Sequence, residues 1–597
     1  MTAGPAAPKL EPRETDREES GMSTGETLTS RFVQAASLDE VRRLGSLVTN
    51  AGGVAIALFA HDDKVFAVEN RCPHMGFPLH RGTVKDGVLT CHWHHARFDL
   101  ETGGTFDQWA DDARVFPVET RDGTVWVDVT QDGDQVDHLR QRLRDGLERQ
   151  LPLVIAKAVI GLDDAGLPPA DALRIGLDFG TRYRAHGWGR GLTTLACMVN
   201  LIPHLEGEDR RRALYHGLAD VAAESAGTAP RFPIRPLAVA VRDPAVFKRW
   251  FRRFVEVRDS EGAERCIASA VRAGATPVQL ADMLFAAATD HRYVTNGHLV
   301  DFTNKALEAL DTAGWEQAEL VLSSLAVAFA RGERMEESNS WRHPVDVVAL
   351  VEEAADQLSG AAAPPRGPRS ESGELVETML GDDPHASVQA ILTALQEGAD
   401  PIEVAGLVAR AAALRIARFH TANEFSDWDT ALHTFTFANA VQQGLRRTQS
   451  SELLRGILDA AMSIYLDRFL NVPPVRLPEP DGSSDPAELL SELPLLLDRQ
   501  QQVNEAGSLV ASYLAAAAEA SALLSGLGSA LLREDRNFHT IQMIEAAFRQ
   551  WSDTADSIFL VAAARYLAAH APTVRAQEQT FTIASRLHRG ERLYEEP

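Results

Sequence analysis

Residues 71–82 read RCPHMGFPLHRG and residues 90–104 read TCHWHHARFDLETGG, and these two segments decide the fold of the N-terminal part. The first segment contains a C-x-H motif and the second a C-x-x-H motif, with sixteen residues between them. Each motif therefore mixes one thiol with one imidazole. A zinc finger instead pairs its two cysteines closely and places its two histidines later, on a helix.

Two cysteines and two histidines in this order suit a [2Fe–2S] cluster with one iron on two thiolates and the other on two imidazoles. Both segments resemble the cluster loops of Rieske proteins, including the Phe98-Asp99 and Thr102-Gly103 pairs of the second loop. Zinc is the alternative that the donor set leaves open. The resemblance implies a cluster that carries one electron at a time, held by Cys72, His74, Cys91 and His94.

Two departures from the Rieske pattern bear on the expected potential. Phe77 and Trp93 stand in the regions where Rieske proteins of respiratory complexes carry a disulfide, so the resemblance is to the ferredoxin or oxygenase type. His95 stands where Gly often follows the last ligand, and Ala96 stands where a Ser can donate a hydrogen bond to the cluster. Loss of such a hydrogen bond lowers the reduction potential, so we expect a value at the low end of the Rieske range.

The sequence around both loops predicts a small antiparallel β domain over residues 31–132. Asp86-Gly87 and Asp122-Gly123 are hairpin-turn signals between runs rich in β-branched and aromatic residues. The expected strands are Val54–Phe59, Val65–Val68, Val88–Thr90, Phe116–Glu119 and Val125–Val129.

The composition of the 597 residues limits the class of protein and its partners. A chain of this length is longer than a single hydrophobic core ordinarily accommodates, so we expect a multi-domain protein. The formal net charge of −25 disfavours nucleic acid and membrane as partners. Neither a transmembrane run nor a signal peptide is evident, and the few cysteines favour a cytoplasmic location. Residues 1–30 are expected to form a disordered tail, and Cys197 and Cys266 to be buried thiols.

From about residue 140 the pattern changes to Ala-, Leu-, Arg- and Glu-rich segments with a helical period. Breaks rich in Pro, Gly and Ser lie at residues 359–372 and 472–486. We therefore expect a large all-α domain in two parts, residues 140–358 and 374–597.

Segment 270–310 resembles segment 394–445, which predicts an internal duplication. Each opens with Gly-Ala and places a proline at an expected helix start. In three segments a histidine precedes a polar residue by six positions: His298 before Asn304, His433 before Asn439, and, more faintly, His539 before Glu545.

These histidines are candidates for a second metal site, with iron as the expected ion, because helical bundles build iron sites from His and carboxylates on several helices. His420 and Glu424, four residues apart, would share one helix face. A pocket for an organic substrate or cofactor and purely structural histidines are the alternatives. The candidate residues are His298, His433, His539, His420 and Glu424, with His291 and Asp290 beside them.

The Asp-x-x-His-x₄-His iron motif of Rieske oxygenases is absent from the sequence. Asp382 and His385 match its first half, but Ala390 stands where the second histidine would be. The resemblance therefore ends near residue 130 and does not carry oxygenase chemistry into the helical part. No Gly-rich dinucleotide fingerprint follows a strand, which argues against NAD or FAD binding.

Three functions fit these observations. In the first, an oxidoreductase takes electrons from a reductase or ferredoxin through the cluster and passes them to a redox site or small-molecule substrate pocket in the helical part. In the second, the chain is an electron carrier whose helical part docks a partner protein. In the third, it is a redox sensor. The first is the hypothesis that we carry forward.

Overall fold

The computed structural model describes residues 32–129, 135–238, 243–358, 372–448, 450–481, 483–516 and 518–593. The chain divides into two compact units. The first takes in the residues up to 72, 78–106 and 112–132, and the second takes in 73–77, 107–111 and 133 onward. The expected tail at 1–30 and all but the last residue of the break at 359–372 lie outside the described residues.

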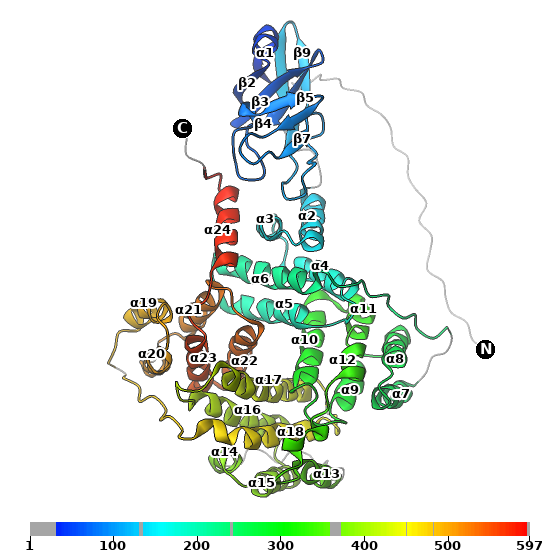
Figure 1. The fold of residues 1–597 in the computed structure, drawn as a ribbon, viewed down its shortest axis with the longest axis vertical. Coiled ribbons are helices and arrows are strands. Elements are labelled where there is room, and N and C mark those ends of the chain that lie inside the picture. The colour runs from blue at the N-terminus through cyan, green and yellow to red at the C-terminus, as the bar shows by residue number, and fades with distance from the viewer. Residues whose placement is uncertain are drawn as a thin grey trace, which may run out of the picture. The chain divides into compact units, whose positions relative to one another are not determined.

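Three small antiparallel sheets form the β part, as the sequence predicts (Figure 1). They are β2 (Ser46–Ala51), β3 (Val54–His61), β4 (Lys64–Glu69) and β8 (Val115–Phe116); β1 (Phe32–Ser37), β10 (Thr124–Asp128) and β9 (Val118–Arg121); and β5 (Thr83–Lys85), β6 (Val88–Thr90) and β7 (Arg97–Asp99). A short helix, α1 (Leu38–Leu44), contributes Val41 to the core. Val41, Ile56, Leu58 and Val125 are among the residues fully buried between the sheets.

Both predicted hairpin turns are present. Asp86 and Gly87 have φ of 52° and 77°, and Asp122 and Gly123 have φ of 48° and 73°. Two successive positive φ values give the turn whose twist matches that of the flanking strands, which explains the Asp-Gly preference. These turns connect β5 to β6 and β9 to β10. The first cluster loop lies between β4 and β5, and the second between β6 and β7.

The second unit is helical, which confirms a β domain followed by a large all-α region. Its first helices are α2 (Gln135–Arg149), α3 (Pro152–Asp164), α4 (Pro169–Arg182), α5 (Arg190–Leu201), α6 (Glu208–Ser225), α7 (Pro244–Glu256), α8 (Ser260–Arg272), α9 (Pro277–Ala288), α10 (His298–Ala313), α11 (Ala318–Ser323), α12 (Ala326–Arg331) and α13 (Val347–Leu358). The later helices are α14 (Ser372–Leu380), α15 (Pro384–Gln396), α16 (Pro401–Ala417), α17 (Phe425–Arg447), α18 (Leu454–Leu466), α19 (Pro486–Leu497), α20 (Val503–Ala515), α21 (Ala520–Leu532), α22 (Phe538–Thr554), α23 (Ser557–Ala569) and α24 (Ala576–His588).

Local sequence sets many of these helix starts. An Asp-Pro pair begins α7, α15, α16 and α19, and in each the Asp side chain accepts a backbone N–H of the first turn. Proline is tolerated at the first helical position because its missing N–H has no partner there in any helix. Thr276 and Gln279 form a reciprocal capping box at the start of α9.

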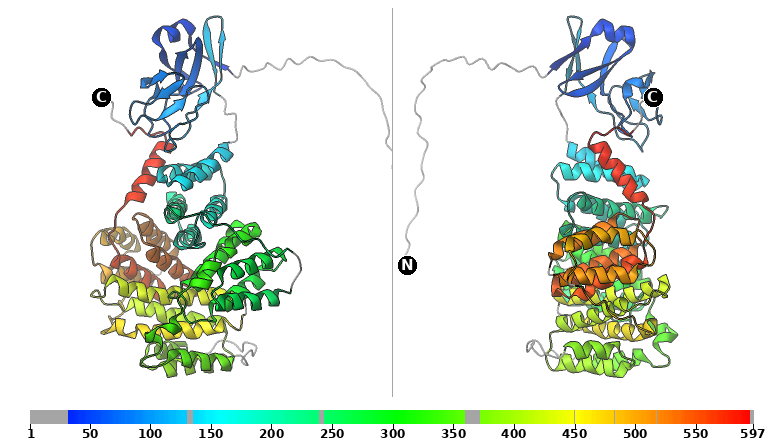
Figure 2. Two further views of the ribbon diagram at one scale, coloured as in Figure 1. Left: turned by 45° about the vertical axis from the view of Figure 1, so that its right-hand side comes forward. Right: turned by 90° about the vertical axis from the view of Figure 1, so that its left-hand side faces the viewer.

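Packing in the second unit joins segments that are far apart in sequence. α10 packs on α17, and α17 packs on α22 and α16. Helix α24, red in Figure 2, packs on α3 and so brings the end of the chain back to the start of the unit. One continuous hydrophobic core runs through these helices. No helix in the described part of the chain is long and apolar enough to cross a membrane.

The internal duplication stays a prediction. The two similar segments do form helix pairs, α9 with α10 and α16 with α17, and proline begins the first helix of each pair. The histidines do not occupy matching positions, however. His298 is the first residue of α10, whereas His433 lies two turns inside α17.

Candidate metal centres

The two cluster loops present their cysteines and histidines differently. Cys72 and Cys91 are buried, with 3% and 1% of their surface exposed, whereas His94 is exposed. The β6–β7 connection is closed by the Cys91 N–H, which donates to the Ala96 carbonyl at 2.8 Å. A cluster held here would have its thiolate side in the protein and one imidazole toward solvent.

The electrostatics of the second loop favour a thiolate. A hydrogen bond with Cys72, opposed by burial and supported by the backbone N–H groups of Trp93 and His94, lowers the pKa of Cys91 to about 6. Thiolate, not thiol, is the form that binds iron. Partial burial and the neighbouring His95 lower the pKa of His94, which keeps that ring neutral and able to ligate at neutral pH.

His95 adopts φ of 62°, in the left-handed region. Gly is favoured there because a side chain costs about 1 kcal/mol. A residue with a side chain therefore holds a left-handed conformation at the position where Gly often follows the last ligand. Aromatic rings flank the predicted ligands: His74 meets Trp109 edge-on at 4.6 Å, and His94 lies 4.3 Å from Trp93, measured between ring centroids.

Three of the helical candidates come together. His298 opens α10, His433 lies in α17, and His539 is the second residue of α22. Candidate ligand atoms of the three side chains all lie within 4.8 Å of one another. The Nε2 atoms of His433 and His539 are 3.1 Å apart. We call these three residues the histidine triad.

The geometry and protonation of the histidine triad suit a metal ion. Imidazole nitrogens bind a metal at about 2.1 Å, so two nitrogens on one metal lie about 3.0 to 3.4 Å apart. Burial, followed by the neighbouring histidines, lowers the pKa of His298 to about 3. Burial, followed by His539, lowers the pKa of His433 to about 4. Both rings are therefore neutral near pH 7, as metal ligation requires.

The carboxylate of Asp429 contacts one imidazole of the histidine triad. His539 Nδ1 lies 3.2 Å from Asp429 Oδ2, and Asp429 Oδ1 accepts a hydrogen bond from the Tyr566 hydroxyl at 2.6 Å. Burial opposes ionisation of Asp429, but hydrogen bonds from His539 and Tyr566 lower its pKa. A carboxylate on Nδ1 fixes the tautomer that leaves the Nε2 lone pair for a metal.

Asp429 is the residue beside the histidine triad that sequence reasoning missed. It precedes His433 by four residues on α17, so an i, i+4 carboxylate–imidazole pair is visible in the sequence. Its partner is nevertheless His539, which reaches it from another helix. One-dimensional spacing could not have shown that pairing.

Phe302 and Phe538 flank the histidine triad on one side. Their ring centroids lie 5.2 and 5.6 Å from that of His298, and 5.9 Å from each other. Phe538 is 9% exposed, whereas the triad histidines are only partly buried. An apolar group placed against these rings would therefore lie next to the triad.

The prediction that His420 and Glu424 share a helix face is wrong. α17 begins only at Phe425, so His420 lies in the preceding loop, where the Ala422 N–H donates to its Nδ1 at 3.0 Å. Glu424 is the N-cap of α17 and forms a capping box with Asp427. Neither belongs to the histidine triad, because a four-residue spacing gives a shared face only inside a helix.

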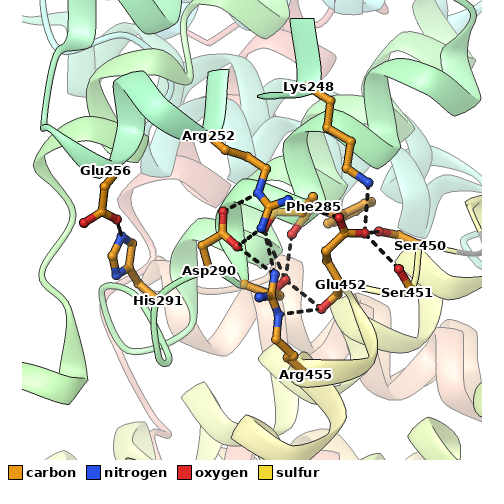
Figure 3. A network of polar contacts seen from close by, with 12 residues as sticks. Lys248, Arg252, Glu256, Phe285, Asp290, His291, Ser450, Ser451, Glu452 and Arg455 are labelled. Carbon is orange, nitrogen blue, oxygen red and sulfur yellow. Dashed lines mark hydrogen bonds and ion pairs between the residues drawn. The ribbon is translucent and has the colours of Figure 1, made fainter. Parts of the chain in front are cut away.

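Asp290 and His291 also serve other contacts (Figure 3). Asp290 accepts hydrogen bonds from Arg252 at 2.6 Å and from Arg455 at 2.8 Å. His291 lies between two carboxylates, 2.6 Å from Glu336 and 3.0 Å from Glu256. These residues form an ion-pair network that joins α7, the end of α9 and α18.

Comparison with known proteins assigns the N-terminal part. The family model for the Rieske [2Fe-2S] domain matches residues 31–117. A 3-phenylpropionate/cinnamic acid dioxygenase ferredoxin subunit from Photorhabdus laumondii is 34% identical over 79 residues, which are 13% of this chain and 75% of that protein. A vanillate O-demethylase oxygenase subunit from a Pseudomonas species is 37% identical over 70 residues, 11% of this chain and 21% of that one.

One solved structure is also similar to a short part of this chain. The ferredoxin–oxygenase complex of carbazole 1,9a-dioxygenase includes a chain that this protein matches with 22% identity and a TM-score of 0.17, over 18% of this chain and all of that one. The protein belongs to the Rieske [2Fe-2S] domain family through its N-terminal part. That domain binds a [2Fe–2S] cluster, and two of its relatives are named as ferredoxin subunits of dioxygenases.

Proposed function

We propose that this protein is an oxidoreductase in which the Rieske cluster passes single electrons to a metal ion, iron, bound by the helical unit. The cluster ligands are Cys72, His74, Cys91 and His94. The ligands of the second metal are His298, His433 and His539. The observation that carries the proposal is this group of three histidines from three separate helices, two of them kept neutral by burial.

The metal, when bound, would supply a redox-active centre with coordination positions left for a small molecule. Asp429 holds His539 in one tautomer and orientation, and Tyr566 in turn fixes Asp429. His298 and His433 offer neutral nitrogens. Phe302 and Phe538 exclude water from one side and give an apolar surface for a substrate.

Electrons enter through the Rieske domain. Relatives of this domain are named as ferredoxin subunits of dioxygenase systems. For this chain we infer that a reductase or a ferredoxin reduces the cluster, one electron at a time. The exposed His94 ring is the ligand through which such a donor would make contact.

The second candidate is an electron carrier without a second metal. The ferredoxin names of the relatives favour it. In that case the helical unit docks a partner protein and the histidine triad has a structural role. Metal content separates the two functions.

The test is metal and sulfide analysis with EPR on anaerobically purified full-length protein. We expect the two irons and two sulfides of a Rieske cluster, with its signal, and one further iron. Cys91→Ser should remove the Rieske signal and keep the further iron. The double variant His433→Ala/His539→Ala should keep the Rieske signal and lose the further iron. The variant His420→Ala, which changes a histidine outside the triad, should keep both. A wild-type protein without the further iron would favour the carrier.

A further inference from the structure

A stripe of polar residues runs along α10 and α22, starting at the histidine triad. On α10 the positions 298, 301, 305 and 308 share one face, and on α22 the positions 539, 542, 545 and 549 do so. Gln542 donates to the Asp301 carboxylate, and Lys305 donates to Glu545 at 2.7 Å. With a rise of 1.5 Å per residue, the stripe extends about 15 Å from His298 to Glu308.

These groups are deeply buried although most are charged. Asp301 and Lys305 are each 1% exposed, Glu545 is 2% exposed and Glu308 is 8% exposed. The Lys305 ammonium also donates to Glu308 at 3.0 Å, so one cation lies between two carboxylates. We call the residues Asp301, Gln542, Lys305, Glu308 and Glu545 the polar column.

Other helices also present polar groups to the polar column. Asn200 on α5 donates to Glu308 at 2.7 Å and to Glu545 at 2.8 Å. Arg549 lies 3.7 Å from Glu308, and the buried Cys197 thiol interacts electrostatically with Glu545 and Lys305. Among the described residues, Gln542 Oε1 is buried and has no hydrogen-bond partner. It can therefore accept a hydrogen bond from a donor next to Asp301.

The far end of the polar column opens to solvent. Glu545, Asn200 and Arg549 line a pocket of about 450 Å³. Glu308, with Asn200 and Arg549, lines a second pocket of about 390 Å³. A chain of ionisable groups therefore leads from surface water to within one helical turn of His298.

A redox site at the histidine triad needs such a chain for electrostatic reasons. Each electron that reaches a partly buried site adds a negative charge, which is costly where water cannot screen it. A proton taken up by a nearby buried carboxylate cancels that charge. Asp301 is the carboxylate of the polar column closest in sequence to the triad, three residues after His298.

We propose that the polar column is a proton route that serves the redox site. For each electron that leaves the cluster and arrives at the triad metal, one proton leaves pocket water, enters the polar column at Glu308 and Glu545 beside the charged Lys305, and ends on the Asp301 carboxylate. The cluster is oxidised and the metal reduced by one electron, and the buried region keeps its net charge. This inference rests on the proposed function, because it takes the triad metal as the electron acceptor.

The environment of Asp301 agrees with this role. Burial, opposed by the charge of Lys305, raises the pKa of Asp301 to about 7. The carboxylate can therefore exchange a proton near neutral pH. Lys305 stays charged, because the attraction of Glu308 and Glu545 outweighs burial and raises its pKa.

The experiment is proton uptake during anaerobic reduction of iron-loaded, full-length protein, followed with a pH indicator in weak buffer. The cluster contribution is subtracted with His433→Ala/His539→Ala, which keeps only the cluster. We expect about one proton for each electron that the triad iron accepts, and slower iron reduction in D₂O than in water. Asp301→Asn, which is isosteric and can still meet the Gln542 amide after a flip, should abolish this uptake while the iron content is unchanged.

Asp467→Asn is the matched control. Asp467 is another buried carboxylate of the helical unit whose pKa burial raises to about 7, but it lies outside the polar column. The variant Asp467→Asn should leave proton uptake unchanged. If Asp301→Asn fails to fold, an equal iron-reduction rate in D₂O and water in the wild-type protein would still overturn the proton route. Absence of the further iron refutes the proposed function and this inference with it, whereas bound iron with unchanged uptake in Asp301→Asn overturns only the proton route.

Discussion

Asp429 shows how much a single side chain adds to the histidine triad. It contacts His539 and Tyr566 and holds the imidazole whose Nε2 faces His433. Loss of a carboxylate that orients a metal-binding histidine lowers metal affinity about 10- to 100-fold. We expect Asp429→Asn to weaken Co²⁺ binding by this factor in a titration of the metal-free protein. Tyr566→Phe should have a smaller effect, and an unchanged affinity in Asp429→Asn would argue against the assigned ligand set.

His95 is a second position where one residue decides a measurable property. Its φ of 62° suits Gly better than any residue with a side chain. We expect the His95→Gly protein to keep its cluster, with the reduction potential as the only cluster property that changes. The substitution should also stabilise the β unit by about 1 kcal/mol. Cluster absorbance and thermal unfolding measure both effects. Loss of the cluster in His95→Gly, with His94 intact, would show that the fourth ligand is misassigned.

At the scale of elements, the start of α10 determines where His298 lies. Gly297 has φ of 84°, and a Cβ at this position would lie 2.7 Å from the Phe437 Cβ on α17. Gly297→Ala should therefore destabilise the helical unit by about 2 kcal/mol and weaken Co²⁺ binding, since α10 must move. Gly274 is the matched control, because its φ is 81° but a Cβ there would meet nothing within 4 Å. Gly274→Ala should cost about 1 kcal/mol and leave metal affinity unchanged.

The ion-pair network of Figure 3 ties α7 to the start of α18 and gives a pH dependence. Burial alone would raise the pKa of Glu452, but the hydrogen bond from Lys248 and the charge of Arg252 lower it to about 2. The ionised form therefore stabilises the folded state fully above pH 4.5, the ordinary value, and this contribution is lost as the pH falls toward 2.

We expect Glu452→Gln to reduce the free energy of unfolding by about 2 kcal/mol at pH 7. The difference from wild type should narrow below pH 4.5 in denaturant unfolding of the helical unit. Glu424→Gln, at a solvent-exposed helix cap, should give a smaller difference. A difference between Glu452→Gln and wild type that stayed constant down to pH 3 would contradict the assigned ionisation.

At the scale of the whole molecule, the three triad histidines all lie in the helical unit, whereas Cys72, Cys91 and His94 of the cluster loops lie in the β unit. A metal that binds only the folded helical unit stabilises it by about 2.7 kcal/mol at a concentration 100 times its Kd. Calorimetry should therefore show Co²⁺ raising the melting temperature of the helical transition while the Rieske transition stays in place. A chelator should reverse the shift, and His433→Ala/His539→Ala should abolish it. A single transition that moves as a whole would contradict independent units.

The features that sequence reasoning identified correctly depend on local order in the chain. The C-x-H and C-x-x-H motifs identify the Rieske domain, because cluster ligands lie on short loops whose spacing is fixed by two hairpins. Asp-Gly pairs mark the turns and Asp-Pro pairs mark helix starts, since both act through neighbouring backbone groups. His298, His433 and His539 are visible as candidates for the same reason: a repeated spacing to a polar residue in each segment.

Which candidate residues meet in space depends on how distant helices pack. His420 and Glu424 have a spacing as suggestive as any, but the start of α17 at Phe425 removes them from a common face. The histidine triad, its Asp429 support and the polar column each join helices more than a hundred residues apart. Such contacts depend on how α10, α17 and α22 pack through the hydrophobic core, and packing of distant helices leaves no period or spacing in the sequence.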